Sequence, residues 1–132
     1  MAFTSNAQTN TNSESEPQRI VFDVTSTDAK IYRSTILMMK VMSESYPDTK
    51  LEVIVYGEAL PMLLKNQSPV GEAVEAFADN ENVAFIACEV SMELLFNVDK
   101  SALLEGVGTI HNAIPDIANK QNNGWGYIKV SN

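Results

Sequence analysis

Residues Val83–Cys88 read VAFIAC, an uncharged run that ends at the only cysteine of the chain. A strand with one face in water alternates apolar and polar residues, so a continuous apolar run predicts a strand buried on both faces. Residues Met92–Phe96 have a helical composition, and Ser91 can cap a helix there. Cys88 is therefore expected beside the free N–H groups of a helix start, where an anion is favoured.

Strand and helix patterns alternate on the N-terminal side of this run. Arg19–Val24 is rich in β-branched and apolar residues, and turn residues follow it. Apolar residues then recur at steps of three and four from Ala29 to Tyr46, which predicts a helix that ends before Pro47. Apolar residues cover most of the circumference of this helix. We therefore expect it to pack against the sheet on one side and against a further surface, such as another subunit, on the other.

The same alternation continues to the end of the chain. Leu51–Tyr56 predicts the next strand. The further predicted elements are a short helix around Ala59–Lys65, a helix over Val70–Ala78, a helical turn over Asp99–Leu104, a weak strand over Gly106–Ile110, a helix around Ile114–Ala118 and a strand over Trp125–Val130. Strands that alternate with helices at this spacing form βαβ units. The sequence therefore predicts an α/β fold of three layers, with a mostly parallel sheet of about five strands and helices on both faces.

In a parallel sheet, binding sites form at the carboxyl ends of the strands. Three predicted loops meet at that edge: Val24–Asp28, Tyr56–Ala59 and Cys88–Met92. There the Cys88 thiolate would act as a nucleophile or a sulfur carrier, stabilised by a helix start. The alternative is that Cys88 is a small apolar core residue, as free cysteines often are. The carboxylates of Glu58, Glu89 and Glu93 would oppose formation of the thiolate if they lie close to it.

The composition predicts one domain. The 132 residues are 45% hydrophobic, which is enough for one core and too few for two domains of ordinary size. Residues 1–18 are rich in Ser, Thr, Asn and Gln, and they carry too little apolar surface to offset the entropy of ordering. They are expected to form a disordered leader, native or added, and the folded domain is expected to span residues 19–132.

Charge and cysteine count argue against several classes of function. The formal net charge is −8 and the pI about 4.5, and the nine basic residues are scattered, which argues against a nucleic-acid or an anionic membrane surface. No apolar stretch approaches the roughly 20 residues that span a bilayer. A single cysteine forms no intrachain disulfide, and the N-terminus has no secretory pattern, so a cytoplasmic location is expected.

Other catalytic chemistries find little support in the sequence. One Cys and one His offer no metal-ligand spacing, so no metal is predicted. His111 follows a different strand from Cys88, which makes a Cys–His nucleophile pair weak and favours a solvent-facing or interface histidine. Gly106-Val107-Gly108 lacks the rest of a dinucleotide fingerprint and no P-loop is present. No cofactor is therefore predicted.

Several segments, in order along the chain, carry a resemblance to a known family: Arg19–Val24, Leu51–Leu60, Leu63–Lys65, Ser68–Val70, Phe85–Glu89 and Gly124–Lys129. The most specific of them are the apolar strand that ends in Cys88-Glu89 and the closing Gly-Trp-Gly-Tyr-Ile-Lys. Together they resemble the DsrE/DsrF-like family of small sulfur-relay proteins, which includes the YchN-type fold. The resemblance covers the chain from Arg19 onward. It implies an α/β protein with a largely parallel sheet that assembles as a trimer or hexamer.

The resemblance also implies a function for Cys88. The matching cysteine of the family accepts sulfur as a persulfide and passes it on, so the expected function is an intracellular sulfur relay with sulfur-donor and sulfur-acceptor proteins as partners. The residues expected to contact the substrate are Tyr56, Gly57, Glu58, Glu89, Val90 and Ser91. Relatives often carry His in place of Tyr56 and Asn-Thr in place of Val90-Ser91, so one activator of the thiol is missing here. With no second cysteine, the acceptor thiol has to come from outside the chain.

Two alternatives to the relay stay open from the residues alone. One is a non-catalytic oligomeric binding or scaffold module of the same fold, in which Cys88 is buried and unreactive. The other is a hydrolase that uses Cys88 with His111 or Glu58, although no triad spacing supports it.

Overall fold

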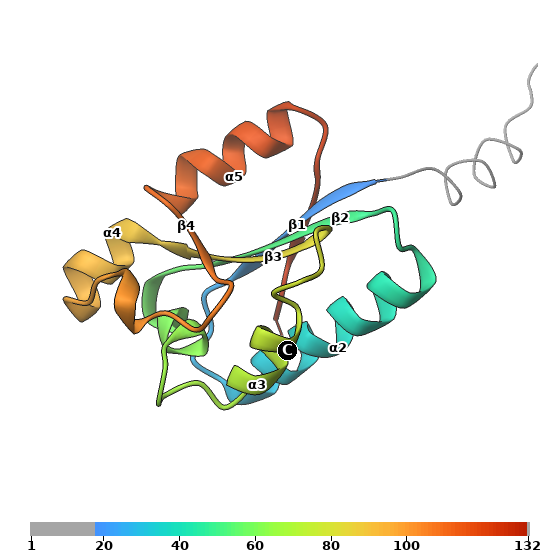
Figure 1. Ribbon diagram of the computed structural model, residues 1–132. Coiled ribbons are helices and arrows are strands. Elements are labelled where there is room, and N and C mark those ends of the chain that lie inside the picture. Colours follow the sequence, from blue (N-terminus) through green and yellow to red (C-terminus); the bar gives the residue numbers. More distant parts are fainter. Residues whose placement is uncertain (1–17, 132) are drawn as a thin grey trace, which may run out of the picture.

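A sheet of five parallel strands lies at the centre of the computed structural model, which describes residues 18–131 (Figure 1). The strands are β1 (Arg19–Val24), β2 (Lys50–Val55), β3 (Val83–Cys88), β4 (Gly108–Ile110) and β5 (Gly126–Lys129), in the spatial order β4-β3-β2-β1-β5. The predicted α/β class and the parallel sheet are confirmed. Apart from Gln18, the predicted leader lies outside the described residues.

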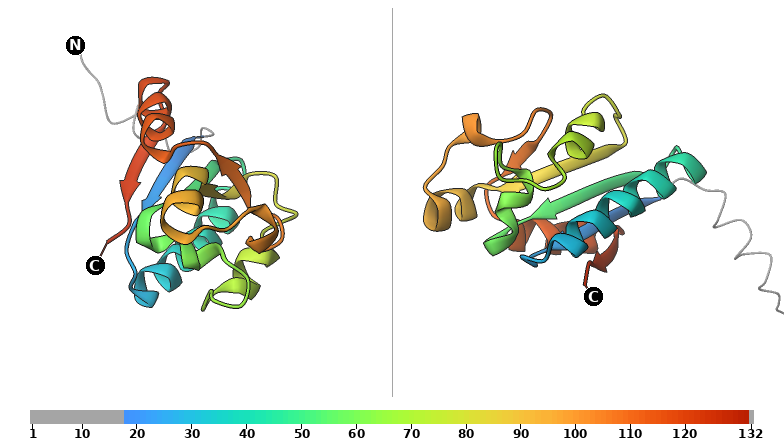
Figure 2. Two further views of the ribbon diagram at one scale, coloured as in Figure 1. Left: turned by 90° about the vertical axis from the view of Figure 1, so that its left-hand side faces the viewer. Right: turned by 90° about the horizontal axis from the view of Figure 1, so that it is seen from below.

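Helical segments connect the strands. They are α2 (Ala29–Ser45), the 3-10 helix η1 (Gly57–Leu63), α3 (Gly71–Ala76), the single turn α4 (Glu89–Ser91), the π-helical turn η2 (Met92–Phe96), the 3-10 turn η3 (Lys100–Ala102) and α5 (Ala113–Asn122). The views of Figures 1 and 2 show α2 and α3 on one side of the sheet and α5 on the other. The structure therefore has the three layers predicted.

Helix α2 begins and ends close to where the sequence predicts. The Asp28 carboxylate accepts a hydrogen bond of 2.9 Å from the Lys30 N–H and so caps the helix. The helix ends at Ser45, two residues before Pro47. The apolar stripe is shorter than predicted, because Tyr46 lies beyond the last helical turn and is exposed.

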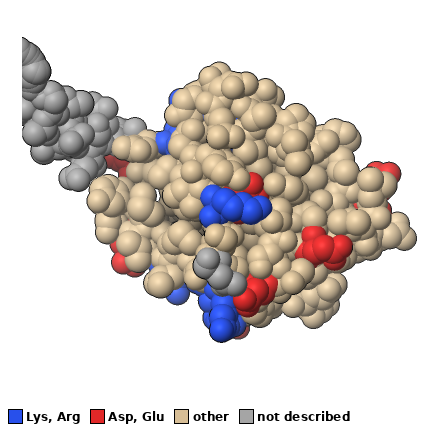
Figure 3. Space-filling view, turned by 180° about the vertical axis from the view of Figure 1, so that it is seen from behind, with Lys and Arg blue, Asp and Glu red and all other residues tan. Residues whose placement is uncertain are grey.

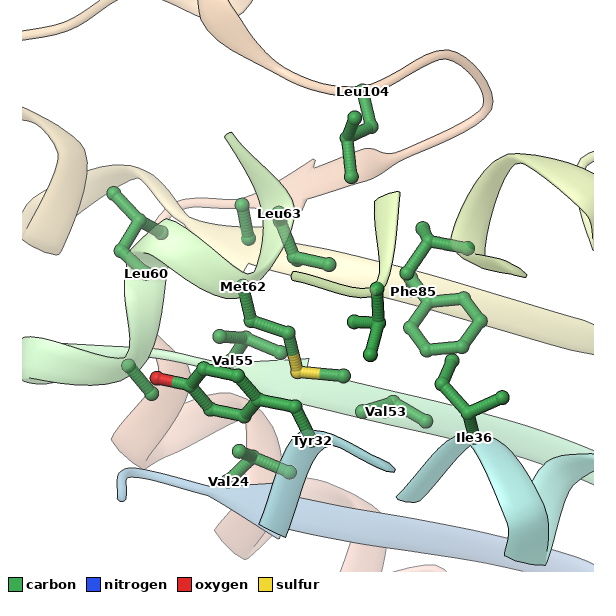
Figure 4. Close-up of a cluster of buried hydrophobic side chains, with 14 of the residues drawn as sticks. Val24, Tyr32, Ile36, Val53, Val55, Leu60, Met62, Leu63, Phe85 and Leu104 are labelled. Carbon is green, nitrogen blue, oxygen red and sulfur yellow. The ribbon is translucent and has the colours of Figure 1, made fainter. Parts of the chain in front are cut away.

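The larger core lies between the sheet and the α2 side. Alternate strand residues such as Phe22, Val53 and Phe85 point toward this side, where Tyr32 and Met39 of α2 meet them. Residues of η1 complete the cluster, with Met62 beside Tyr32 (Figure 4). Each fully buried side chain of this size contributes about 1.5–3 kcal/mol to folding. This core fixes the sheet on which the candidate site depends.

A smaller core lies on the opposite face of the sheet, under α5. The strands contribute Val21, Ile54 and Cys88, and α5 contributes Ala113 and Ile117. Because the side chains of a strand alternate between faces, the side chain of Cys88 points toward α5 and away from the larger core.

Neighbouring strands β3 and β4 send the chain to opposite faces of the sheet. After β3 the chain passes to the side of the larger core, in which Met92 is buried. After β4 it passes to α5 on the other face. Open α/β sheets bind ligands at the carboxyl ends of strands where the connections diverge in this way. In this chain the point of divergence is at Cys88 and Ile110, which are paired across the two strands.

Candidate functional site

Cys88 is the last residue of β3, and its neighbours follow from the register of the sheet. Val55 pairs with Ala87, so Tyr56 continues β2 beside Cys88, and Cys88 itself pairs with Ile110 of β4. All three side chains belong to the cluster under α5. Only 2% of the surface of Cys88 is exposed. The thiol is therefore enclosed in this structure.

The sulfur lies at the start of α5. The N–H of Ala113, the first residue of α5, donates a hydrogen bond of 3.4 Å to the Cys88 Sγ. The Cys88 thiol in turn faces the His111 carbonyl oxygen at 3.9 Å. Between them, Asn112 caps the helix through its side chain. The predicted contact between the cysteine and a helix start exists, but the helix is α5, which follows β4, and the predicted helix after Ser91 does not provide it.

Ser91 does not cap a helix, which corrects the prediction. The helical turn begins directly at Glu89, with Cys88 at its cap position and no side-chain cap. Ser91 lies at the end of this turn, and its hydroxyl instead accepts a hydrogen bond of 2.8 Å from the Gly57 N–H. Gly57 has a φ of +62°, which turns the chain out of β2. Ser91 therefore joins the carboxyl ends of β2 and β3.

The connection from β4 to α5 covers the thiol. Its first residue, His111, accepts a hydrogen bond of 3.0 Å from the Val90 N–H through its carbonyl oxygen. The His111 imidazole points away from the sulfur, since its side chain is 85% exposed and its Nδ1 lies 4.0 Å from Glu89 Oε1. Cys88 and His111 therefore do not form a nucleophile pair, and His111 is the solvent-facing histidine that the sequence favours. We call residues 111–112, which connect β4 to α5, the thiol cover.

Glu89 ties this cover to the neighbouring segments. Its carboxylate accepts a hydrogen bond of 2.6 Å from the Thr109 hydroxyl, lies 3.7 Å from the Lys100 ammonium and faces His111. The Thr109 hydrogen bond, with smaller contributions from Lys100 and His111, lowers the pKa of Glu89 below its ordinary value. Glu89 is therefore charged at neutral pH and holds β4, η3 and the cover together.

Not every predicted contact residue faces the thiol. Tyr56 and Val90 pack in the cluster that contains Cys88, and Gly57 approaches through Ser91. Glu58 is exposed at the start of η1, and its carboxylate makes no ion pair or hydrogen bond within residues 18–131.

Residues 18–130 match the DsrE/DsrF-like family. The chain belongs to this family. No curated protein matches the chain.

Solved structures show the same fold as this DsrE/DsrF-like chain. MTH1491 from Methanobacterium thermoautotrophicum, a protein of unknown function, is 24% identical with a TM-score of 0.77, and the match covers 85% of this chain and 98% of that one. The YchN protein of E. coli is 16% identical with a TM-score of 0.69, covering 85% and 98%. BT1422 from Bacteroides thetaiotaomicron, also of unknown function, is 16% identical with a TM-score of 0.68, covering 86% and 95%.

The DsrE/DsrF-like domain also holds a polar cluster that the sequence reasoning missed. Asp23 is buried in β1, on the face that carries Cys88, and its carboxylate accepts a hydrogen bond from the Tyr127 hydroxyl. Lys129 lies 3.3 Å from the same carboxylate and donates a hydrogen bond of 2.7 Å to the Thr25 hydroxyl. The hydrogen bond to Asp23 raises the pKa of Tyr127 to about 12. The pKa of Tyr56 is raised more than that of Tyr127, mainly by burial and to a smaller extent by Asp23.

A sequence signal for this cluster exists. Asp23 is a charged residue inside an apolar strand, and such a residue needs partners when the strand is buried. Tyr127 and Lys129 lie two residues apart on the closing strand, in register with Val21 and Asp23. Asp23 contributes to the raised pKa of Tyr56, and Tyr56 packs in the cluster that contains Cys88, so the polar cluster borders one wall of the thiol site.

The described residues contain no group of three side chains able to hold a metal ion. Nor does any helix among residues 18–131 have the length and apolar character to cross a membrane. A groove of about 680 Å³ lies between Arg33 of α2, Leu64, Leu104 and the start of α3, and it does not include Cys88.

Proposed function

We propose that this chain carries sulfur as a persulfide on Cys88 and passes it to the thiol of a partner. The observation that supports this most is the hydrogen bond from the Ala113 N–H to the Cys88 Sγ. Free N–H groups and the macrodipole at a helix start favour an anion by about 0.3–1 kcal/mol. A persulfide is more acidic than its thiol and is therefore an anion at neutral pH. The family membership of the chain agrees with this function.

The loading step is an exchange between sulfur atoms. The Cys88 thiolate attacks the outer sulfur of a donor persulfide, a new S–S bond forms, the donor S–S bond breaks, and the donor leaves as a thiolate. In the second step an acceptor thiolate attacks the outer sulfur on Cys88, and Cys88 leaves as the thiolate. No external oxidant or reductant is needed in either step. Both the donor and the acceptor come from outside, since the chain has one cysteine.

Burial of the Cys88 Sγ favours transfer over loss of sulfide. An acceptor that attacks the inner sulfur of a persulfide releases sulfide and leaves a mixed disulfide. In this chain the inner sulfur is enclosed by Tyr56, Ile110 and Ala113, whereas the added outer sulfur has to displace the thiol cover and extend beyond it. We therefore expect attack at the outer sulfur.

Loading also requires the cover to move. The His111 carbonyl oxygen accepts from the thiol in the neutral state, but it repels the sulfur once the proton is lost. The Ala113 N–H stabilises the sulfur in both states. Deprotonation therefore weakens one contact of the cover and keeps the contact with α5.

The proposal is tested by incubating the protein with a low-molecular-weight persulfide and recording its intact mass. We expect the wild-type chain to gain one sulfur atom and the Cys88→Ser variant to gain none. A dithiol should remove the added sulfur. A wild-type protein that stays at its original mass under conditions that load a small free thiol contradicts the proposal.

The burial of Cys88 favours a second candidate, a non-catalytic oligomeric binding or scaffold module in which the cysteine is only a core residue. The two functions differ in the rate at which iodoacetamide alkylates Cys88 in the folded protein. In a scaffold, Cys88 is alkylated only when the whole chain unfolds, so the alkylation rate depends on the global stability. A carrier reacts through local opening of the cover, so its rate changes little with mutations in the larger core.

A further inference from the structure

Two leucines are exposed on the turn that follows the candidate site. In η2, 73% of Leu94 and 53% of Leu95 are exposed, whereas Met92 of the same turn is buried in the larger core. The turn is held by the N–H groups of Asn97 and Val98, which both donate to the Met92 carbonyl oxygen. Neighbouring apolar side chains on a fixed turn form an exposed patch of the kind that marks contact surfaces.

Met92 and Glu93 of the same turn line a hollow of about 350 Å³. Met92 and Val98 give it apolar walls, and Glu89, Glu93 and Asp99 contribute carboxylates. Lys100 is the one cation among the residues that line it, and it pairs with Glu89. Glu93 makes no ion pair or hydrogen bond within the described residues. Apolar walls with acidic groups match the apolar stem and charged head of a Lys or Arg side chain.

The charge around this hollow indicates the kind of partner. The start of η1 packs beside α4 and η2, and it adds the exposed, unpaired Glu58 to the same end of the molecule. The left view of Figure 2 faces this end, with α4 toward the viewer. A second copy docked here about a two-fold axis would bring the same carboxylates against each other, which costs free energy. A partner with positive charge around an apolar contact is complementary to it.

We propose that Leu94, Leu95 and the adjoining acidic hollow form the docking surface for a sulfur partner that is a basic protein, which presents a Lys or Arg side chain next to an apolar one. This inference rests on the proposed function, because it names the class of protein that exchanges sulfur with Cys88. The hollow receives the basic side chain, the leucines receive the apolar one, and the partner thiol is brought to the thiol cover beside Glu89.

Synthetic peptides with one activated cysteine test the docking surface. The three peptides differ in the residues on both sides of the cysteine: the first has Leu and Lys, the second Leu and Glu, and the third Ser and Lys. In each peptide the cysteine is activated as a mixed disulfide with pyridine-2-thiol. The Cys88 thiolate attacks the peptide sulfur, the bond to the pyridine sulfur breaks, and pyridine-2-thione leaves and is measured by its absorbance. The rate constants are compared with that of neutral iodoacetamide, which reports the intrinsic reactivity of Cys88.

We expect the Leu-Lys peptide to react about tenfold faster than the Leu-Glu peptide at low ionic strength, and this ratio to fall as salt is added. Glu93→Gln should lower the ratio about threefold, whereas Glu72→Gln on α3, the matched control, should leave it unchanged. Leu94→Ser combined with Leu95→Ser should abolish the advantage of the Leu-Lys over the Ser-Lys peptide. Both leucines are exposed, so this variant is expected to fold, and iodoacetamide should alkylate it at the wild-type rate.

Equal rates for the three peptides overturn the docking surface, and the relay function survives that result if the protein still loads persulfide. If the peptides are ranked as expected but no persulfide is accepted, the docking surface stands and the relay is wrong. If neither the peptides nor iodoacetamide react with the folded protein, both proposals fail.

Discussion

At the scale of single residues, the thiol site depends on a buried carboxylate that does not touch the sulfur. Asp23 accepts a hydrogen bond from the Tyr127 phenol and also raises the pKa of a second phenol, Tyr56, which packs beside Cys88. The protonated phenols are favoured in the folded state, because ionising them next to Asp23 brings two negative charges together. Asp23 therefore helps to keep Tyr56 and Tyr127 protonated.

This arrangement predicts the effect of Asp23→Asn on the phenols. The pKa of Tyr127 rises from 10.0 to about 12 on folding, so its contribution to stability is complete below pH 10 and is lost as the pH rises to about 12. In Asp23→Asn, the phenolate absorbance should appear at lower pH than in the wild type. The same variant should lose about 1–3 kcal/mol of stability at neutral pH. A titration curve that coincides with the wild-type curve contradicts the hydrogen bond from Tyr127 to Asp23.

At the scale of elements, Glu89 controls the cover over the thiol. Its carboxylate links Thr109 of β4, Lys100 of η3 and His111. In Glu89→Gln the ionic contacts are lost, so the cover should open more often and iodoacetamide should alkylate Cys88 about twofold to fivefold faster. Glu105→Gln, an exposed carboxylate away from the cover, is the control. A Glu89→Gln rate equal to or below the wild-type rate is evidence that the cover opens elsewhere.

Helix α5 is held on the sheet by a second set of charges. The Lys120 ammonium lies 2.9 Å from Glu52 Oε1 and 2.6 Å from Asp116 Oδ2, and it also lies over the ring of Trp125. Burial lowers the pKa of Lys120, but the hydrogen bond to Asp116 and the ion pair with Glu52 outweigh this and raise the pKa above its ordinary value. The stabilisation is therefore present below pH 10.5 and is lost as the pH rises through the higher folded pKa.

Lys120→Met should accordingly lower the stability by about 2 kcal/mol at neutral pH, since it leaves two neighbouring carboxylates unpaired. Chemical denaturation measures this loss, and the difference from the wild type should shrink above pH 10.5. Lys40→Met serves as the control, because the Lys40 ammonium is exposed and makes no ion pair within residues 18–131. An equal loss of stability in Lys120→Met and Lys40→Met would contradict a stabilising role for the contacts of Lys120.

The elements also show what the sequence predicts and what it misses. The strands and the long helix α2 were predictable, because their apolar period is strong and turn residues bound them. The helix start at the sulfur was assigned to the wrong helix, since proximity in sequence favoured Met92–Phe96 whereas the fold brings Ala113 to Cys88. No local pattern encodes that contact. The role of Ser91 was missed for the same reason, because Gly57 is distant in sequence.

At the scale of the whole molecule, the surface is suited to contact with other proteins. Leu37 and Val41 lie one turn apart on α2, and 62% and 51% of their surfaces are exposed. Seen from behind, the molecule shows few charged side chains among uncharged ones (Figure 3). We propose that copies of this chain assemble through the exposed α2 surface into a trimer or hexamer.

The assembly is tested with Leu37→Asp, which places a charge on α2 without touching the buried face of the helix. Sedimentation should show an oligomer for the wild type at micromolar concentration and a smaller species for the variant. Both proteins should melt cooperatively. A wild-type chain that sediments as a monomer at every concentration contradicts the proposal.

The most direct measurement of the central claim follows the sulfur after it is loaded. The wild-type chain is loaded with isotopically labelled outer sulfur on Cys88, freed of donor and mixed with an excess of an acceptor thiol. Our account predicts that the label moves to the acceptor as a persulfide while Cys88 returns as the thiol. Label that is released as sulfide, with the acceptor left in a mixed disulfide on Cys88, would contradict it.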